Sequence, residues 1–142
     1  MFTLMITGFD ADPQIVTDLI GLEPSSTVVK GEMGTSGHKH KFNGWWLEAH
    51  PDRLKNGVDH AESVSAIINQ LRGREAAFQQ LKKDLQPGQI TLYGAVYFNP
   101  DGQCGLWLDA SDMGVLAACA VDWGIDLFAE DQSASTLAAT KS

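Results

Sequence analysis

Cysteine, positive charge and long apolar runs are all scarce in this chain of 142 residues. Two cysteines are too few for the disulfide framework of a small secreted protein, so we expect a reducing, cytoplasmic setting. No segment approaches the roughly 20 apolar residues that a membrane-spanning helix needs. Met1 and Phe2 lead into a short alternating segment rather than a signal peptide. The composition therefore excludes membrane-spanning and disulfide-rich classes.

Positive charge is outnumbered: ten Lys and Arg face eighteen Asp and Glu, which gives a net charge of −8 and a pI near 4.7. Phosphate backbones repel such a chain unless its basic residues are segregated on one patch. Neither Lys39 and Lys41 nor Lys82 and Lys83 form a basic stripe with interleaved aromatics. We expect no nucleic-acid partner. The acidity suits a basic protein partner, although it is also an ordinary source of solubility.

Hydrophobic periodicity predicts a chain of alternating strands and helices. Strands are predicted at 2–9, 27–30, 44–49, 90–98, 105–109 and 125–129. Helices are predicted to begin at Pro13, near His60 and at Ser111, and Arg72-Gly73-Arg74 interrupts the second of them. The turn Asn99-Pro100-Asp101-Gly102 predicts that 90–98 and 105–109 form a hairpin.

The order β-α-β-β-α-β-β-α-β indicates an α+β fold related to ferredoxin-like folds, because its first six elements follow the split β-α-β pattern. We expect a mixed, mainly antiparallel sheet with helices on one face. Two fused sheets are the alternative architecture. Residues 1–129 are predicted to form a single domain, and the small, polar residues 130–142 a flexible C-terminal tail.

Several segments carry a resemblance to a known family. They are Asp12-Pro13 after the first strand, Leu19-Ile20-Gly21-Leu22-Glu23-Pro24, Lys30-Gly31-Glu32, Gly44-Trp45 with Leu47, Gly105-Leu106-Trp107-Leu108 and Trp123-Gly124-Ile125-Asp126-Leu127-Phe128. In this order they resemble the bacterial family called domain of unknown function 4279. The resemblance implies a small, stand-alone protein with no assigned reaction. It therefore transfers no catalytic residue, binding residue or cofactor. The tract from Thr35 to Lys41 departs from the family pattern.

One histidine pair keeps a metal site or a small enzyme as the alternative function. His38 and His40 would project to the same side of an extended segment. A catalytic zinc site needs a third protein ligand, for which Glu32, Glu48 or His50 are the candidates. The competing interpretation is a solvated loop with two ordinary histidines. We assign no catalytic residue and expect no cofactor.

Acidic residues gather late in the chain: Asp109, Asp112, Asp122, Asp126, Glu130 and Asp131. Paired carboxylates can act as acid and base where their surroundings separate their pKa values. Aspartate at turns and helix starts more often caps backbone N–H groups, and this is the role that we expect here. The sequence contains neither a nucleophile elbow nor a phosphate-binding loop.

Four tryptophans give the best indication of function. Consecutive Trp45 and Trp46 in a strand must point to opposite faces, so helices on one face leave one ring partly exposed. Together with Trp107 this ring predicts an apolar patch that binds a protein partner or a second copy of the chain. We therefore expect a non-catalytic protein-binding or self-associating module, and neutralisation of a basic toxin is its most specific version. The competing interpretation is that long loops cover the patch.

Overall fold

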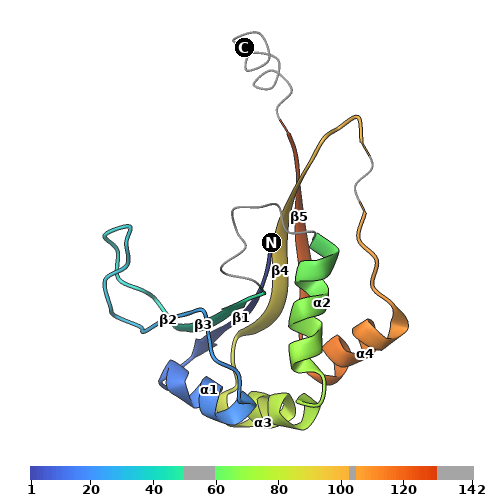
Figure 1. Cartoon of the computed structure of the whole chain (residues 1–142). Helices are drawn as coiled ribbons and strands as arrows, with labels where there is room; N and C mark the ends of the chain where they lie inside the picture. The colour runs from blue at the N-terminus through green and yellow to red at the C-terminus, as the bar shows by residue number, and fades with distance from the viewer. Residues whose placement is uncertain (50–59, 103–104, 131–142) are drawn as a thin grey trace.

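The computed structural model describes residues 1–49, 60–102 and 105–130, which form one five-stranded sheet and four helices (Figure 1). The strands are β1 (Phe2–Phe9), β2 (Ser26–Val28), β3 (Asn43–Glu48), β4 (Gln89–Phe98) and β5 (Asp122–Ala129). The helices are α1 (Pro13–Ile20), α2 (His60–Leu71), α3 (Glu75–Leu85) and α4 (Ala110–Ala118). No helix among the described residues is both long and apolar enough to cross a membrane.

The strands lie in the order β2-β3-β1-β4-β5. The pairs β2–β3, β3–β1 and β1–β4 are antiparallel, and β4–β5 is parallel. All the helices lie on one side of the sheet (Figure 1). The α+β class, the mixed and mainly antiparallel sheet and the single helical layer are therefore confirmed.

The first helix begins where the sequence predicts. Asp12 is its N-cap, and its side chain accepts a hydrogen bond of 2.8 Å from the backbone N–H of Gln14. Pro13 occupies the first turn, where a missing N–H costs no helical hydrogen bond. Gly21 ends the helix in the left-handed region at φ +70°, which glycine adopts without steric cost.

The predicted break between the second and third helices is confirmed. Gly73 takes a φ of +79° between α2 and α3. Beside it the Arg74 guanidinium donates to two helix-terminal carbonyls, at 2.8 Å from Ile20 O and 3.0 Å from Gln70 O. A cation at the carboxyl end of a helix also opposes the negative end of its dipole. Arg74 thus joins the ends of α1 and α2.

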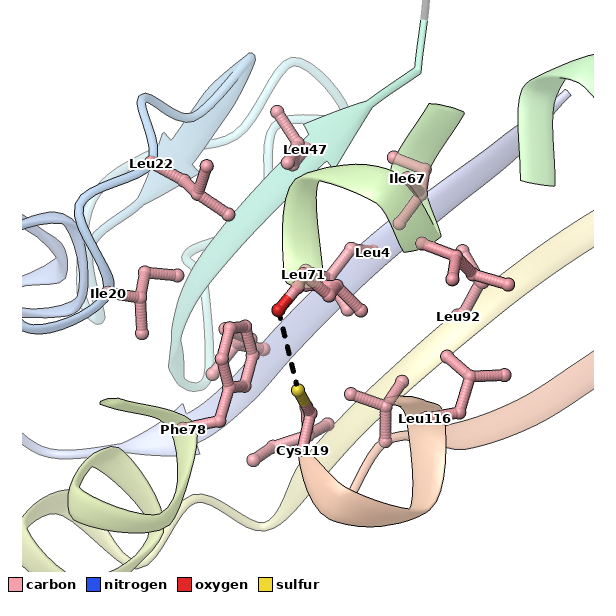
Figure 2. Packing of buried hydrophobic residues seen from close by; sticks show 14 of the residues in the cluster. Leu4, Ile20, Leu22, Leu47, Ile67, Leu71, Phe78, Leu92, Leu116 and Cys119 are labelled. Carbon is pink, nitrogen blue, oxygen red and sulfur yellow. Dashed lines mark hydrogen bonds between the residues drawn. The ribbon is translucent and has the colours of Figure 1, made fainter. Parts of the chain in front are cut away.

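The core fills the space between the sheet and the helices, and Figure 2 shows its central part. Every second residue of β1, β3 and β4 points into it, while the helices supply their apolar stripes. The largest fully buried side chains are Trp45, Phe2 and Phe78. Cys119 lies beside Phe78 and Leu116 in this packing, and its thiol approaches Leu71 O at 4.0 Å (Figure 2).

One predicted element is wrong. Residues 105–109 form no strand, so the order of elements is β-α-β-β-α-α-β-α-β rather than the predicted one. Both sides of β4 are already occupied, by β1 and by the parallel strand β5, so no side remains for a hairpin partner. The alternation of Leu106, Trp107 and Leu108 has another cause. The two leucines pack against the core, and Trp107 points outward.

The buried thiol of Cys119 should be chemically inert in the folded protein. Burial, and secondarily the nearby charge of Glu75, raise its pKa from 9.0 to about 11. At pH 8 only about a thousandth of such thiols is ionised, and the thiolate is the reactive form. With Cys104 replaced by serine, we expect a thiol reagent to label Cys119 at least tenfold more slowly in native than in urea-unfolded protein.

The same shift fixes the sign of a pH effect. Because the folded thiol holds its proton more tightly than the unfolded one, the free energy of unfolding should fall as the pH rises from 9 towards 11. The Cys119→Ala variant should lack this part of the pH dependence. Rapid labelling of native protein at pH 8 would contradict the packing shown in Figure 2.

Candidate functional site at the free end of β4 and β5

The two adjacent tryptophans do point to opposite faces of the sheet. Trp45 is fully buried on the helix side, and its indole N–H donates to Thr17 Oγ1 of α1 at 3.0 Å. Trp46 lies half-buried on the other face, where its ring covers Gly44 so closely that a Cβ there would collide with it. Trp45 therefore belongs to the core, and of this pair only Trp46 contributes to the surface.

Trp107 lies elsewhere on the molecule. Its side chain is 86% exposed, in the segment 105–109 that leads into α4. That segment runs beside α2 and α4, whereas β2 and β3 lie at the opposite side of the molecule (Figure 1). The structure therefore does not bring Trp46 and Trp107 into one patch.

A cluster of exposed apolar side chains instead occupies the free end of β4 and β5, which continue beyond the helical layer (Figure 1). We call the exposed Tyr97, Leu127 and Phe128, together with the half-buried Phe98 beside them, the tip. The rings of Tyr97 and Phe128 stack with centroids 5.1 Å apart, yet remain 64% and 43% exposed. Leu127 is 61% exposed and, being next to Phe128, points to the other face. The tip therefore exposes apolar groups on both faces of the sheet.

A cavity of about 500 Å³ opens on the helix side of the tip. Its walls come from both strands, from the start of α2 and from the segment before α4. They are formed by His60, Val96, Tyr97, Phe98, Asn99, Gly102, Gly105, Leu106, Ile125 and Leu127. Since Leu106 and Leu127 share this cavity, the exposed ring of Trp107 is attached to the same region of the surface.

A side-chain hydrogen bond joins β4 and β5 next to the tip. Tyr93 Oη donates to Asp126 Oδ2 at 2.6 Å across the parallel pair β4–β5. This bond is the main cause that raises the pKa of Tyr93 above its ordinary value of 10.0, and desolvation is the second. The tyrosine thus stays protonated and ties β5 to β4 through side chains as well as through the backbone.

Negative charge is concentrated in the part of the chain that forms β4, α4 and β5. All ten Lys and Arg residues lie outside residues 84–140, whereas eight of the eighteen acids lie inside this stretch. Ten acids and ten cations remain for the rest of the chain, which is therefore balanced. The eight acids are Asp84, Asp101, Asp109, Asp112, Asp122, Asp126, Glu130 and Asp131. Not all of these acids lie near the tip, since Asp84 belongs to α3 and Asp112 is paired with Arg72, but Asp122, Asp126 and Glu130 lie in or directly after β5.

The predicted histidine pair lies in an arm between β2 and β3. The arm is held by backbone hydrogen bonds of 2.9 Å from Gly31 N to His40 O and from His40 N to Glu32 O, and by a bridge between Met33 and Lys39. Within the described part of the chain, no three His, Cys, Asp or Glu side chains are grouped to hold a metal ion. Glu32 and Glu48 therefore do not complete a site with His38 and His40, and His50 lies outside the described residues.

Some late acids do have the structural roles expected of them. Asp109, rather than the predicted Ser111, is the N-cap of α4, and its side-chain oxygen accepts a hydrogen bond of 2.8 Å from the backbone N–H of Asp112. Asp112 in turn pairs with Arg72 at 2.5 Å and so links α4 to α2. Asp122 and Glu130, however, make no side-chain hydrogen bond or ion pair with any described residue, and Asp131 lies outside the described residues.

Sequence reasoning missed the tip as a candidate site. The sequence predicts both of its strands but not their parallel pairing. The predicted hairpin between 90–98 and 105–109 assigns that side of β4 to another segment. The available signal was the run of apolar residues in Asp126-Leu127-Phe128-Ala129, which places apolar side chains on both faces of a strand. A strand buried on one face only would alternate.

Comparisons with known proteins give one match. No curated protein and no solved structure matches this chain. The model of a domain of unknown function, DUF4279, matches residues 1–129 and thus covers β1 to β5 with all four helices. Since that match spans most of the 142 residues, the chain belongs to the DUF4279 family.

Proposed function

We propose that this protein is a non-catalytic, cytoplasmic protein-binding module that binds its partner through the tip and the adjoining ring of Trp107. The exposure of apolar side chains on both faces of one strand pair carries this proposal. Exposed Leu, Phe and Trp side chains that lie together on a folded protein mark interaction sites, whereas scattered ones do not. Aromatic residues are also the side chains on which binding energy concentrates at interfaces.

The placement of the tryptophans changes which of the predicted residues take part. Trp107 remains in the proposed surface because its segment shares the cavity beside Leu127. Trp45 supports the fold instead, since none of its surface is accessible. Trp46 is flattened on Gly44, and it is separated from β5 by β1 and β4. The proposed surface is thus smaller than the sequence suggested and lies at one end of the sheet.

Paired substitutions test this function. Leu127→Ser with Phe128→Ser removes two exposed side chains of the tip, and Met33→Ser removes a 65% exposed side chain from the distant arm. Each variant and the wild type should be used as bait in bacterial extract, with quantitative mass spectrometry of the retained proteins. Light scattering over a wide concentration range should report self-association. We expect the tip variant alone to lose a bound protein, or a dimer, by at least tenfold.

The control distinguishes the tip from apolar exposure in general. If Met33→Ser loses the same proteins, the binding is non-specific and depends on exposed apolar side chains in general rather than on the tip. If wild type and tip variant retain identical proteins and both stay monomeric, the proposed function is wrong. Thermal unfolding of each variant confirms that loss of binding is not loss of the fold.

A further inference from the structure

The outer edge of β5 presents an unused row of backbone groups. The N–H of Glu130 donates to Phe98 O of β4 at 2.8 Å, directly after the end of β5. Because successive residues of a strand direct their N–H and C=O groups to alternate sides, the even-numbered residues face β4 and the odd-numbered ones face outward. Trp123, Ile125, Leu127 and Ala129 therefore point their backbone groups away from the sheet. No backbone hydrogen bond to them from any described residue is seen on that side.

This edge lacks several features that commonly keep sheet edges from pairing. Short strands, lysines, prolines and bulges block an edge, whereas long regular strands invite another chain. β5 pairs with β4 without interruption over eight residues from Asp122 to Ala129, and it contains neither lysine nor proline. At the other end of the sheet, β2 has only three residues. The two edges thus differ, and only the β5 edge is long enough to pair along its length with another strand.

The two faces of β5 carry different chemistry. Asp122 and Asp126 lie on the face away from the helices, and continuing the alternation places Glu130 on the same side. Ile125 and Leu127 lie on the helix face, next to the cavity that Leu106 also lines. A strand added to this edge would therefore have an acidic neighbour on one face and an apolar neighbour on the other.

The negative charge on β5 determines which kind of strand this edge can bind. A second copy would bring another β5, with its own Asp122 and Asp126, beside the same acids of the first copy. Like charges on adjacent strands are destabilising, and opposite charges stabilise. A segment that alternates Lys or Arg with apolar residues instead matches both faces of β5.

We propose that the β5 edge accepts an extended basic segment of a partner protein as a sixth strand of the sheet. Backbone groups of the odd-numbered residues pair with the segment. Its cations face Asp122, Asp126 and Glu130, and its apolar side chains face Ile125 and Leu127. Strand addition of this kind takes affinity from the main chain and specificity from alternate side chains. This inference rests on the proposed function and specifies the partner's chemistry.

Synthetic peptides test the edge directly with the full chain. The first probe is a fluorescent nine-residue peptide that alternates lysine and valine. The second has glutamate in place of lysine. The third is made in two versions, with N-methyl groups either on the odd-numbered or on the even-numbered residues, so that only one version lacks the N–H groups that would pair with β5. We expect anisotropy to show binding of the lysine peptide and of one methylated version, with at least tenfold weaker binding of the glutamate peptide and of the other methylated version. Binding should weaken as salt rises.

Two variants of one residue separate backbone pairing from side-chain contact. Leu127→Ala and Leu127→Pro both remove the exposed side chain, but only proline removes the outward N–H. We expect the proline variant to bind the lysine peptide at least tenfold more weakly than the alanine variant. Circular dichroism and unfolding of both variants check the fold. The methylated peptides give the same answer with unaltered protein if the proline variant does not fold.

The outcomes separate this inference from the proposed function. Equal binding of the lysine and glutamate peptides, or equal effects of both methylation phases, overturns the basic strand. A dimer that Leu127→Pro abolishes and Leu127→Ala retains would make a second copy the occupant and also overturn it. In either case the tip variant can still lose its partner in extract, which leaves the proposed function standing. Only failure of that experiment removes the proposed function itself.

Discussion

Gly94→Val should lower the free energy of unfolding by about 3 kcal/mol, as is found when a close-packed core is overfilled. A Cβ on Gly94 would lie 2.5 Å from Cε1 and 2.6 Å from Cδ1 of the Phe2 ring. The ring has no room to retreat. It is fully buried, stacked on Trp123 with centroids 5.0 Å apart, and edge-on to His60 at 6.3 Å. Urea unfolding followed by circular dichroism measures the loss.

Propensity alone predicts the opposite sign for this substitution. Valine is favoured over glycine in strands by up to about 1 kcal/mol. Gly114→Ala is the matched control, because a Cβ at Gly114 in the middle of α4 would have no heavy atom within 4 Å beyond its chain neighbours and its own helix backbone. Alanine should stabilise that helix by about 0.5–1 kcal/mol. A Gly94→Val protein as stable as the wild type would show that Phe2 does not occupy the position described.

Trp45→Ala should cost about 4 kcal/mol, since removing a fully buried aromatic ring typically costs 3–5 kcal/mol. The substitution also leaves Thr17 Oγ1 without its indole donor, 3.0 Å away in a buried position. The indole bridges β3 and α1, so the helix would lose this hydrogen bond to the sheet. Urea unfolding gives the change in stability.

The two surface tryptophans provide the comparison for Trp45. Trp107→Ala should change stability by less than about 0.5 kcal/mol, because its side chain is 86% exposed. Trp46→Ala should fall between the two, since the ring is half-buried over Gly44. Equal losses for Trp45 and Trp107 would contradict the assignment of the first to the core and of the second to the surface.

Most of the fold follows from local signals with a single physical cause. Asp12, Pro13 and Gly21 delimit α1 because each satisfies a backbone requirement that few other residues meet. The break at Gly73 follows from the cost of glycine inside a helix. The opposite orientation of Trp45 and Trp46 follows from the pleat alone. Such signals act within a few residues, so the sequence by itself is sufficient to locate them.

Pairing between distant strands depends on competition, which no local signal contains. Leu106 and Leu108 alternate as a strand would, but they pack against the core while β5 takes the side of β4. The sequence distance between Phe98 and Ala129 hides that they are neighbours. For the same reason the sequence predicts the binding site at Trp45, Trp46 and Trp107 and not at the tip. Tyr97 and Phe128 stack only because β5 pairs with β4, and no local signal in the sequence predicts that pairing.

The parallel crossover through α4 has a consequence for synthesis on the ribosome. β1, β3 and β4 are complete in the nascent chain before β5 has been translated, and β1 is already flanked on both sides. Until β5 emerges from the ribosome, the outer edge of β4 has no hydrogen-bonding partner. Newly made proteins aggregate or recruit chaperones at such transiently unpaired strand edges. Slower translation of codons 110–130 should therefore lengthen the interval in which this chain needs protection.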